Sequence, residues 1–148
     1  MRAVVTRVRS ASVEIGGEIK SSIAQGFLVL LGVHEDDGEA EAVKIADKIC
    51  GLRVFEDENG KMNLNPEAAG CPNLLIISQF TLFADCRSRR PGFSKAARPE
   101  KAIPLYEKVI SLCRERGFTV GTGEFGADML VESVNDGPVT IILDTKEL

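Results

Sequence analysis

The run Phe27-Leu28-Val29-Leu30-Leu31-Gly32-Val33 constrains the fold of this chain more than any other segment. Successive side chains of an extended strand point to opposite faces, and in this run both faces are apolar. Strands of this kind lie at the centre of sheets whose two sides are both covered. The run therefore predicts a central strand.

Several other segments predict strands and turns. Residues 1–9 alternate loosely and predict a strand, and Gly16-Gly17 between residues 12–15 and 18–20 predicts a hairpin. Asp57-Glu58-Asn59-Gly60 is typical of a turn. Further strands are predicted at 52–55, 74–77, 118–122, 129–134 and 139–143.

Two segments show the apolar periodicity of helices. Ala42, Ile45, Ala46 and Ile49 form one stripe, in a helix that we expect Asp36 or Asp37 to cap. A second helix is predicted from about Pro99 to Arg116, ending at Gly117. Pro104 fits that helix best within its first turn, which favours a start nearer Lys101.

These elements predict one α/β domain over residues 1–148. We expect a mixed β-sheet with an N-terminal hairpin, two main helices and three C-terminal strands, in a layered, barrel-like arrangement. The chain is 44% hydrophobic and 27% charged, which excludes disordered and fibrous proteins.

The sequence predicts a cytoplasmic protein without membrane contact. No apolar run approaches the roughly 18 residues of a spanning helix, and the N-terminal segment lacks the continuous apolar region of a signal peptide. The widely spaced Cys50, Cys71, Cys86 and Cys113 indicate free thiols. Since these cysteines form no close pair and His34 is the only histidine, we expect no structural zinc site. We also expect no cofactor.

Two motifs resemble ligand sites but favour simpler interpretations. The segment Gly121–Gly126 matches G-x-G-x-x-G, yet a strand pattern follows it where a dinucleotide site needs a helix. We therefore expect a glycine-rich turn. The acids of His34-Glu35-Asp36-Asp37 precede a helix and suit its positive end better than a metal ion.

The segment Ser78-Gln79-Phe80-Thr81-Leu82 directly follows a buried strand. Ligands of α/β sheets bind at the carboxyl ends of strands, where these hydroxyls and this amide would lie. They could bind a carbonyl oxygen or position a water molecule. A nucleophilic Ser or Thr needs a base, and no histidine is near in sequence, so a hydrogen-bonding cap of the strand fits the residues better.

Positive charge concentrates between residues 87 and 101 although the chain has a net charge of −4. This basic segment contains Phe93 and one acid, Glu100. A local reversal of sign favours a phosphate-rich partner over a merely solvated loop. Its cationic residues are Arg87, Arg89, Arg90, Lys95, Arg98 and Lys101.

The segment Asn135-Asp136-Gly137-Pro138-Val139-Thr140 lies between two predicted strands, and its composition predicts a turn. Since X-Pro bonds are cis in only about 5–6% of cases, the composition predicts a trans bond before Pro138.

Together with Arg90–Phe93 and Phe125–Met129, the 78–82 and 135–140 motifs give the chain a resemblance to the D-aminoacyl-tRNA deacylase family. These enzymes hydrolyse D-amino acids from mischarged tRNA. The resemblance covers essentially the whole chain.

The resemblance implies a homodimer with two active sites at its interface and with aminoacylated tRNA as substrate. In each site, residues 78–81 of one chain form a pocket, and Gly137-Pro138 of the other chain enters it with a cis peptide bond. Main-chain groups of this element accept the α-amino group of the substrate and leave no room for an L side chain. Glycine has no side chain to reject, so glycyl-tRNA is an expected second substrate.

The resemblance also assigns roles to individual residues. Catalytic roles fall to Gln79 and Thr81. The implied substrate-binding residues are Ser78, Phe80, Phe93, Phe125, Met129, Asn135, Gly137, Pro138, Val139 and Thr140, and tRNA binding falls to Arg87, Arg89, Arg90, Lys95 and Arg98.

Several chemical and functional alternatives remain open. Backbone amides near Phe80 and Thr81 could stabilise the oxyanion, Thr81 could attack the ester itself, or a ribose hydroxyl of the tRNA could activate water. Two other functions compete with deacylation. One is a nucleic-acid-binding module without chemistry, and the other is a small-molecule acyl hydrolase with a Thr or Cys nucleophile.

Overall fold

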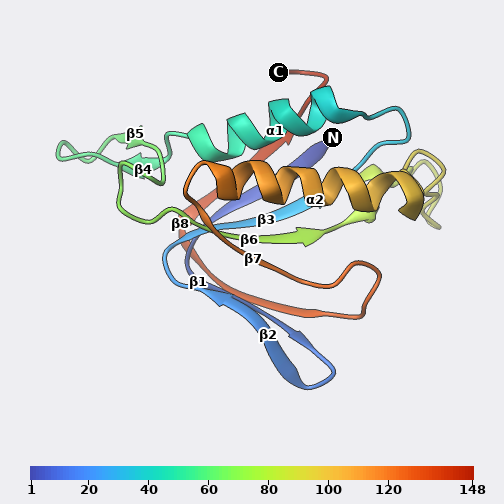
Figure 1. The fold of residues 1–148 in the computed structure, drawn as a ribbon, viewed down its shortest axis with the longest axis horizontal. Coiled ribbons are helices and arrows are strands. Elements are labelled where there is room, and N and C mark those ends of the chain that lie inside the picture. Colours follow the sequence, from blue (N-terminus) through green and yellow to red (C-terminus); the bar gives the residue numbers. More distant parts are fainter.

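The predicted central strand is β3 (Gly26–Gly32) in the computed structural model, which describes residues 1–148 (Figure 1). It pairs antiparallel with β1 (Arg2–Ile15) and parallel with β6 (Asn73–Ser78). On the far side of β6 lies β7 (Thr119–Thr122), also parallel. The sheet is therefore mixed, as predicted.

The long strand β1 lets the sheet curl. One edge of β1 pairs with β3 over residues 2–8 and with β2 (Glu18–Ile23) over residues 11–15, while β8 (Leu130–Asp144) follows the other edge. The β2 strand also reaches β7, because the Ser21 hydroxyl donates to the Thr122 carbonyl at 3.0 Å. The result is a sheet that closes almost into a barrel, with the predicted hairpin turn at Gly16 and Gly17 (φ +60° and +84°).

Two helices cover one face of this sheet (Figure 1). Helix α1 (Glu39–Gly51) lies between β3 and β6 in the chain, and α2 (Pro99–Glu115) lies between β6 and β7. Because both connect parallel strands, the two helices run in the same direction. The main core lies between helices and sheet, and a smaller one fills the curl of the sheet around Val8, Val13, Leu28, Leu75 and Ile77. No helix is long and apolar enough to cross a membrane.

The cap of α1 and one of the two starts considered for α2 differ from the predictions. The N-cap of α1 is Gly38, whose N–H donates to the Glu41 carboxylate at 2.8 Å. Asp37 cannot cap α1 because its carboxylate binds the His34 N–H and the Met1 ammonium, at 2.7 and 2.8 Å. Helix α2 begins at Pro99, so Pro104 lies beyond its first turn, where it is exposed. The start predicted at about Pro99 is confirmed, and the alternative start near Lys101 is wrong.

The strand predictions also need correction. Residues 129–134 and 139–143 belong to one continuous strand, β8, so two C-terminal strands exist instead of three. The strand predicted at 52–55 is the short β4 (Phe55–Glu56), which forms a hairpin with β5 (Met62–Leu64) around the predicted turn. The glycine-rich segment Gly121–Gly126 begins in the last residues of β7, and the next element is β8 and not a helix, as predicted.

Candidate active site

A cavity of about 660 Å³ opens at the carboxyl end of β6. Its lining is mostly apolar, as in most small-molecule sites. One wall is the end of β6, a second is the N-terminal half of α2 with the segment before it, and a third is the loop before β8. The predicted site residues in this lining are Ser78, Gln79, Phe80, Phe93, Arg98, Phe125 and Met129.

The polar end of the cavity forms where β6 gives way to the 3-10 helix η1 (Phe80–Phe83). The Gln79 N–H donates to the Leu31 carbonyl at 2.8 Å, which extends the strand pairing by one residue. The Gln79 side-chain amide then donates to the Thr81 hydroxyl at 2.5 Å. The backbone amides of Phe80 and Thr81 donate to no group of the chain, because the first amides of a helix have no partner within it.

Aromatic rings form two edges of the cavity. Phe80 and Phe93 meet edge to face with ring centroids 5.0 Å apart, and Phe80 is 53% exposed. On the inner wall, Tyr106 contacts Phe125, and its hydroxyl donates to the Ile76 carbonyl at 2.6 Å. Burial raises the pKa of Tyr106. Tyr106 is therefore a protonated structural donor and not a base.

The Asn135–Thr140 segment is a bulge within β8. Its neighbour β1 pairs Thr6 with Thr140 and Val8 with Asn135, so the residues between them project from the ladder. Asn135 closes the bulge, since its side-chain oxygen accepts the Val139 N–H at 3.2 Å. The Gly137-Pro138 bond is cis, as the family resemblance implies and contrary to the trans bond that composition predicts.

Arg7 anchors this bulge, although the sequence analysis did not single it out. Its side chain is 8% exposed, and its Nε–H donates to the Asp136 carbonyl at 3.0 Å. A second donor, Nη1, binds the Val54 carbonyl at 2.6 Å. Arg7 thus ties the bulge to the segment before β4. Because Asp136 and Val54 lie far from Arg7 in the sequence, no local sequence pattern indicates these contacts.

Within one chain, the two predicted halves of the site do not meet. Gly137 and Pro138 are exposed, and no residue from 135 to 140 lines the cavity. The cavity wall also includes Ala102, Tyr106 and Asp128, to which the sequence analysis assigned no role in the site. Nothing in a single sequence distinguishes Ala102 and Tyr106 from the other apolar residues of α2.

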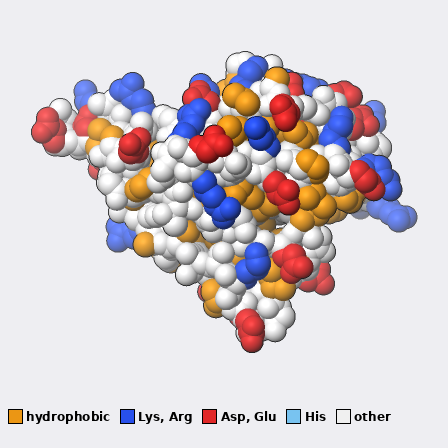
Figure 2. All heavy atoms as spheres, in the orientation of Figure 1, with side chains coloured by type: hydrophobic (Ala, Val, Ile, Leu, Met, Phe, Trp, Pro, Cys, Tyr) orange, Lys and Arg blue, Asp and Glu red, His pale blue; other side chains and the backbone are white.

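The basic segment leads from η1 to α2 at the edge of the molecule and projects at the right of Figure 1. Arg98 lines the cavity. Arg89 and Arg90 are exposed and form no ion pair, and Lys95 is exposed as well. Arg87 is engaged by Asp85 at 2.5 Å, and its guanidinium lowers the pKa of the Asp85 carboxyl. Elsewhere on the face in Figure 2, charges of both signs are interspersed over the two helices.

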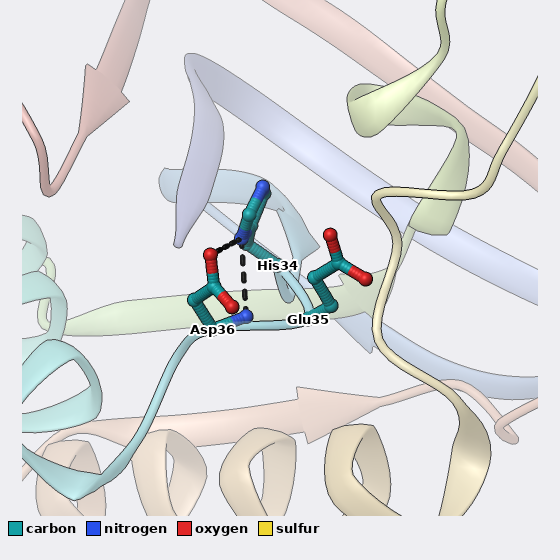
Figure 3. A group of neighbouring side chains, drawn as sticks. All are labelled: His34, Glu35 and Asp36. Atoms are coloured by element: carbon teal, nitrogen blue, oxygen red, sulfur yellow. Dashed lines mark hydrogen bonds and ion pairs between the residues drawn. The ribbon is translucent and has the colours of Figure 1, made fainter.

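The His34, Glu35 and Asp36 side chains cluster after β3, with their potential ligand atoms within 4.8 Å of one another (Figure 3). The buried His34 ring is committed to a turn, since its Nδ1 accepts the Asp36 N–H at 3.1 Å. The Phe83 ring packs edge to face against His34 at 5.1 Å. These contacts agree with a structural role for the cluster.

Comparisons with known proteins identify relatives along the whole chain. Residues 4–144 match the family described as D-Tyr-tRNA(Tyr) deacylase. A protein of Clostridioides difficile (strain 630) named D-aminoacyl-tRNA deacylase is 53% identical over 99% of both chains. One of Anaeromyxobacter dehalogenans (strain 2CP-C) with the same name is 54% identical over 100% of this chain and 99% of its own.

Two solved structures share the fold. One, described as c-Myc DNA Unwinding Element Binding Protein, is 40% identical and superimposes with a TM-score of 0.91 over 98% of this chain and 99% of its own. The other, described as a probable eukaryotic D-amino acid tRNA deacylase, is 15% identical with a TM-score of 0.77, over 96% of this chain and 97% of its own.

Proposed function

This chain belongs to the D-aminoacyl-tRNA deacylase family, and from this premise we propose how its residues select and hydrolyse the substrate. The protein is an enzyme that hydrolyses the ester bond of D-aminoacyl-tRNA. Water is consumed, and the free D-amino acid and tRNA are released. We place the reaction in the cytoplasm, where aminoacyl-tRNAs are made and used.

In our proposal, each active site is shared between two copies of the chain. One protomer supplies Ser78, Gln79 and Phe80 in the wall of its cavity, with Thr81 beside them at the Gln79 amide, and the other protomer inserts Gly137-Pro138. The observation that carries this proposal is that the β8 bulge is exposed and lies outside the cavity of its own chain.

The surface around β8 has the character of an interface. Only β1 pairs with β8, so the other edge of this long strand is free. Large apolar side chains are exposed along it, and a second copy of the chain would cover them. They are Leu130, Val131, Val134 and Ile142.

Stereoselection then depends on the backbone of the inserted bulge. Following the family resemblance, the main-chain oxygens of Gly137 and Pro138 accept the α-ammonium group of the substrate. An L side chain would collide with this backbone, whereas a D side chain points away from it. Glycine offers nothing to exclude, so glycyl-tRNA is a second substrate in this proposal. Asn135, Val139 and Thr140 hold the bulge in shape.

The chemical step requires orientation and an oxyanion site, because the ester is already activated. The free amides of Phe80 and Thr81 are suitable donors to the oxyanion. A single donor of this kind contributes about 2.7–4 kcal/mol to transition-state binding.

A ribose hydroxyl of the tRNA activates the attacking water in this proposal. The cavity wall contains neither histidine nor cysteine, and the Gln79 amide donates to Thr81 and cannot take its proton. The observations therefore favour the 2′-hydroxyl over a Thr81 nucleophile, and this hydroxyl distinguishes RNA from DNA.

The basic segment would hold the tRNA backbone near the cavity. Arg89, Arg90 and Lys95 are exposed and lack carboxylate partners, while Arg98 reaches the cavity wall. Phosphate contacts of this kind position a nucleic acid without reading its sequence. Phe80, Phe93, Phe125 and Met129 would contact the terminal nucleotide and the aminoacyl group.

The test compares matched D-tyrosyl-tRNA, L-tyrosyl-tRNA and glycyl-tRNA at equal enzyme concentration. We expect the D and glycyl esters to be hydrolysed at least about 100-fold faster than the L ester. The reason is that the backbone of the bulge excludes the L side chain, so the site binds the transition state of that ester poorly. Binding that leaves all three esters intact would instead indicate a nucleic-acid-binding module. An acyl-enzyme trapped on Thr81, with equal rates for D and L esters, would indicate a nucleophilic hydrolase.

A further inference from the structure

Two cysteine thiols without a role in deacylation meet where α1 packs against α2. Cys50 lies in the last turn of α1 and Cys113 in the last turn of α2. Because the helices run in the same direction, these two ends lie together (Figure 1). Both residues belong to the main core, and each thiol is the largest influence on the pKa of the other. The two sulfur atoms are therefore neighbours.

The two thiols differ in their access to solvent. A surface cleft of about 460 Å³, separate from the active-site cavity, is lined by Cys50 but not by Cys113. Cys113 is 0% exposed, whereas Cys50 is 5% exposed. The cleft is mostly polar, and Arg116 and Asp47 form an ion pair in its wall at 2.8 Å. A small polar molecule in the cleft thus approaches the pair from the side of Cys50.

The surroundings also make Cys50 the more acidic of the two. The hydrogen bond from Cys113 lowers the pKa of the Cys50 thiol more than burial raises it, and the Arg116 guanidinium lowers it further. The same hydrogen bond, together with burial, raises the pKa of Cys113. Since the thiolate is the reactive form of cysteine, Cys50 is the nucleophile of the pair.

We propose that Cys50 and Cys113 form a redox pair that a small hydroperoxide converts to a disulfide between the two helices. The Cys50 thiolate attacks a peroxide oxygen, the O–O bond breaks, and Cys50 sulfenic acid and the first water (or alcohol) result. The Cys113 sulfur then attacks the Cys50 sulfur and expels the second water. Two thiols lose two electrons and two protons, and the peroxide is reduced.

The other two cysteines lack these features. Cys71 is buried, and burial raises the pKa of its thiol. Cys86 is exposed immediately before the basic segment, with no second thiol beside it. They serve as internal references for the accessibility and the reactivity of an ordinary thiol in this chain.

The experiment treats the intact protein with hydrogen peroxide, alkylates the remaining thiols after denaturation, and maps the peptides by mass spectrometry. We expect the peptides with Cys50 and Cys113 to be joined, with the loss of two hydrogen atoms, and to separate again with dithiothreitol. A Cys86→Ser variant should form the same link. If Cys86 is oxidised while Cys50 and Cys113 are both alkylated, the proposal is wrong.

Single variants test the order of the two steps. In Cys113→Ala, a dimedone probe should label Cys50 as a stable sulfenic acid, while in Cys50→Ala the same probe should leave Cys113 unlabelled. Equal labelling of the two thiols, or labelling of Cys113 alone, would contradict the assignment of Cys50 as the nucleophile. Even if one variant fails to fold, the peptide map of the unmodified protein shows whether the disulfide forms.

Discussion

Replacing Arg7 with methionine tests whether this side chain fixes the β8 bulge. Methionine keeps an unbranched apolar stem beside the Phe55 ring, over which the guanidinium now lies at 5.9 Å. The donors to the Asp136 and Val54 carbonyls are lost. The substitution therefore removes hydrogen bonds while changing the apolar packing little.

The expected loss follows from these two bonds. A hydrogen bond that involves a charged group contributes about 1.5–3 kcal/mol, so two bonds give a loss of at least about 3 kcal/mol in the free energy of unfolding. For a domain of this size, each kcal/mol lowers the Tm by about 2–4 °C, which predicts a decrease of at least about 6 °C.

Arg9→Met is the matched control, because it removes the same charge from the same strand. Arg9 also faces Asp136, at 3.7 Å, but its side chain is 76% exposed. An exposed ion pair contributes about 0–1 kcal/mol. Urea unfolding at one protein concentration and D-tyrosyl-tRNA deacylation compare the two variants. If they unfold within about 1 kcal/mol of each other and are equally active, Arg7 does not anchor the bulge.

Three further variants probe the chemistry and the tRNA surface. Thr81→Ala should retain measurable single-turnover deacylation, because the backbone amides remain; complete loss with an intact fold would favour a covalent role. Glutamate at both Arg89 and Arg90 should weaken tRNA binding and reduce the salt slope by about two, whereas an unchanged slope would mean that neither touches phosphate. Asp85→Asn should release Arg87, tighten binding and steepen the slope by about one, unless Arg87 lies away from the tRNA. Because Arg87 lowers the pKa of Asp85, the ion pair in the unmodified protein should persist through the pH range in which a free aspartate protonates. Mild acid should therefore not have the same effect on tRNA binding as Asp85→Asn.

The parts of the fold that the sequence predicted are those with strong local patterns. Strands β3 and β6 are apolar on both faces, and the buried stripe of α1 recurs with helical spacing. The glycine pair at residues 16–17 permits the tight turn of the first hairpin. In each case the residues whose pattern predicts the element lie within the element itself or beside it.

The wrong predictions concern segments whose structure depends on contacts with residues far away in the sequence. Asn135–Pro138 has the composition of a turn, but pairing with β1 on both sides keeps β8 continuous across it. Asp is a residue type that commonly caps helices, but the Asp37 carboxylate binds the His34 N–H and the Met1 ammonium instead. In the candidate site, the residues at the end of β6 were predictable from their place after a buried strand. Arg7 was not, because its partners lie far along the chain.

The most direct test of the shared active site combines two variants that are each inactive for a different reason. Ala102→Trp fills the cavity that Ala102 lines. Gly137→Ala displaces the bulge, because φ is +134° there and an added Cβ would lie 2.9 Å from a Val139 methyl group. In a homodimer with shared sites, a mixed dimer has one site with an intact cavity and an intact bulge.

Random exchange of equal amounts of the two variants makes half of the dimers mixed, with one of two sites intact in each. The account therefore predicts recovery of about a quarter of the unmodified activity toward D-tyrosyl-tRNA. Differently tagged subunits verify that mixed dimers have formed. Mixed dimers that remain as inactive as the separate variants would contradict the claim that the bulge of one protomer completes the cavity of its partner.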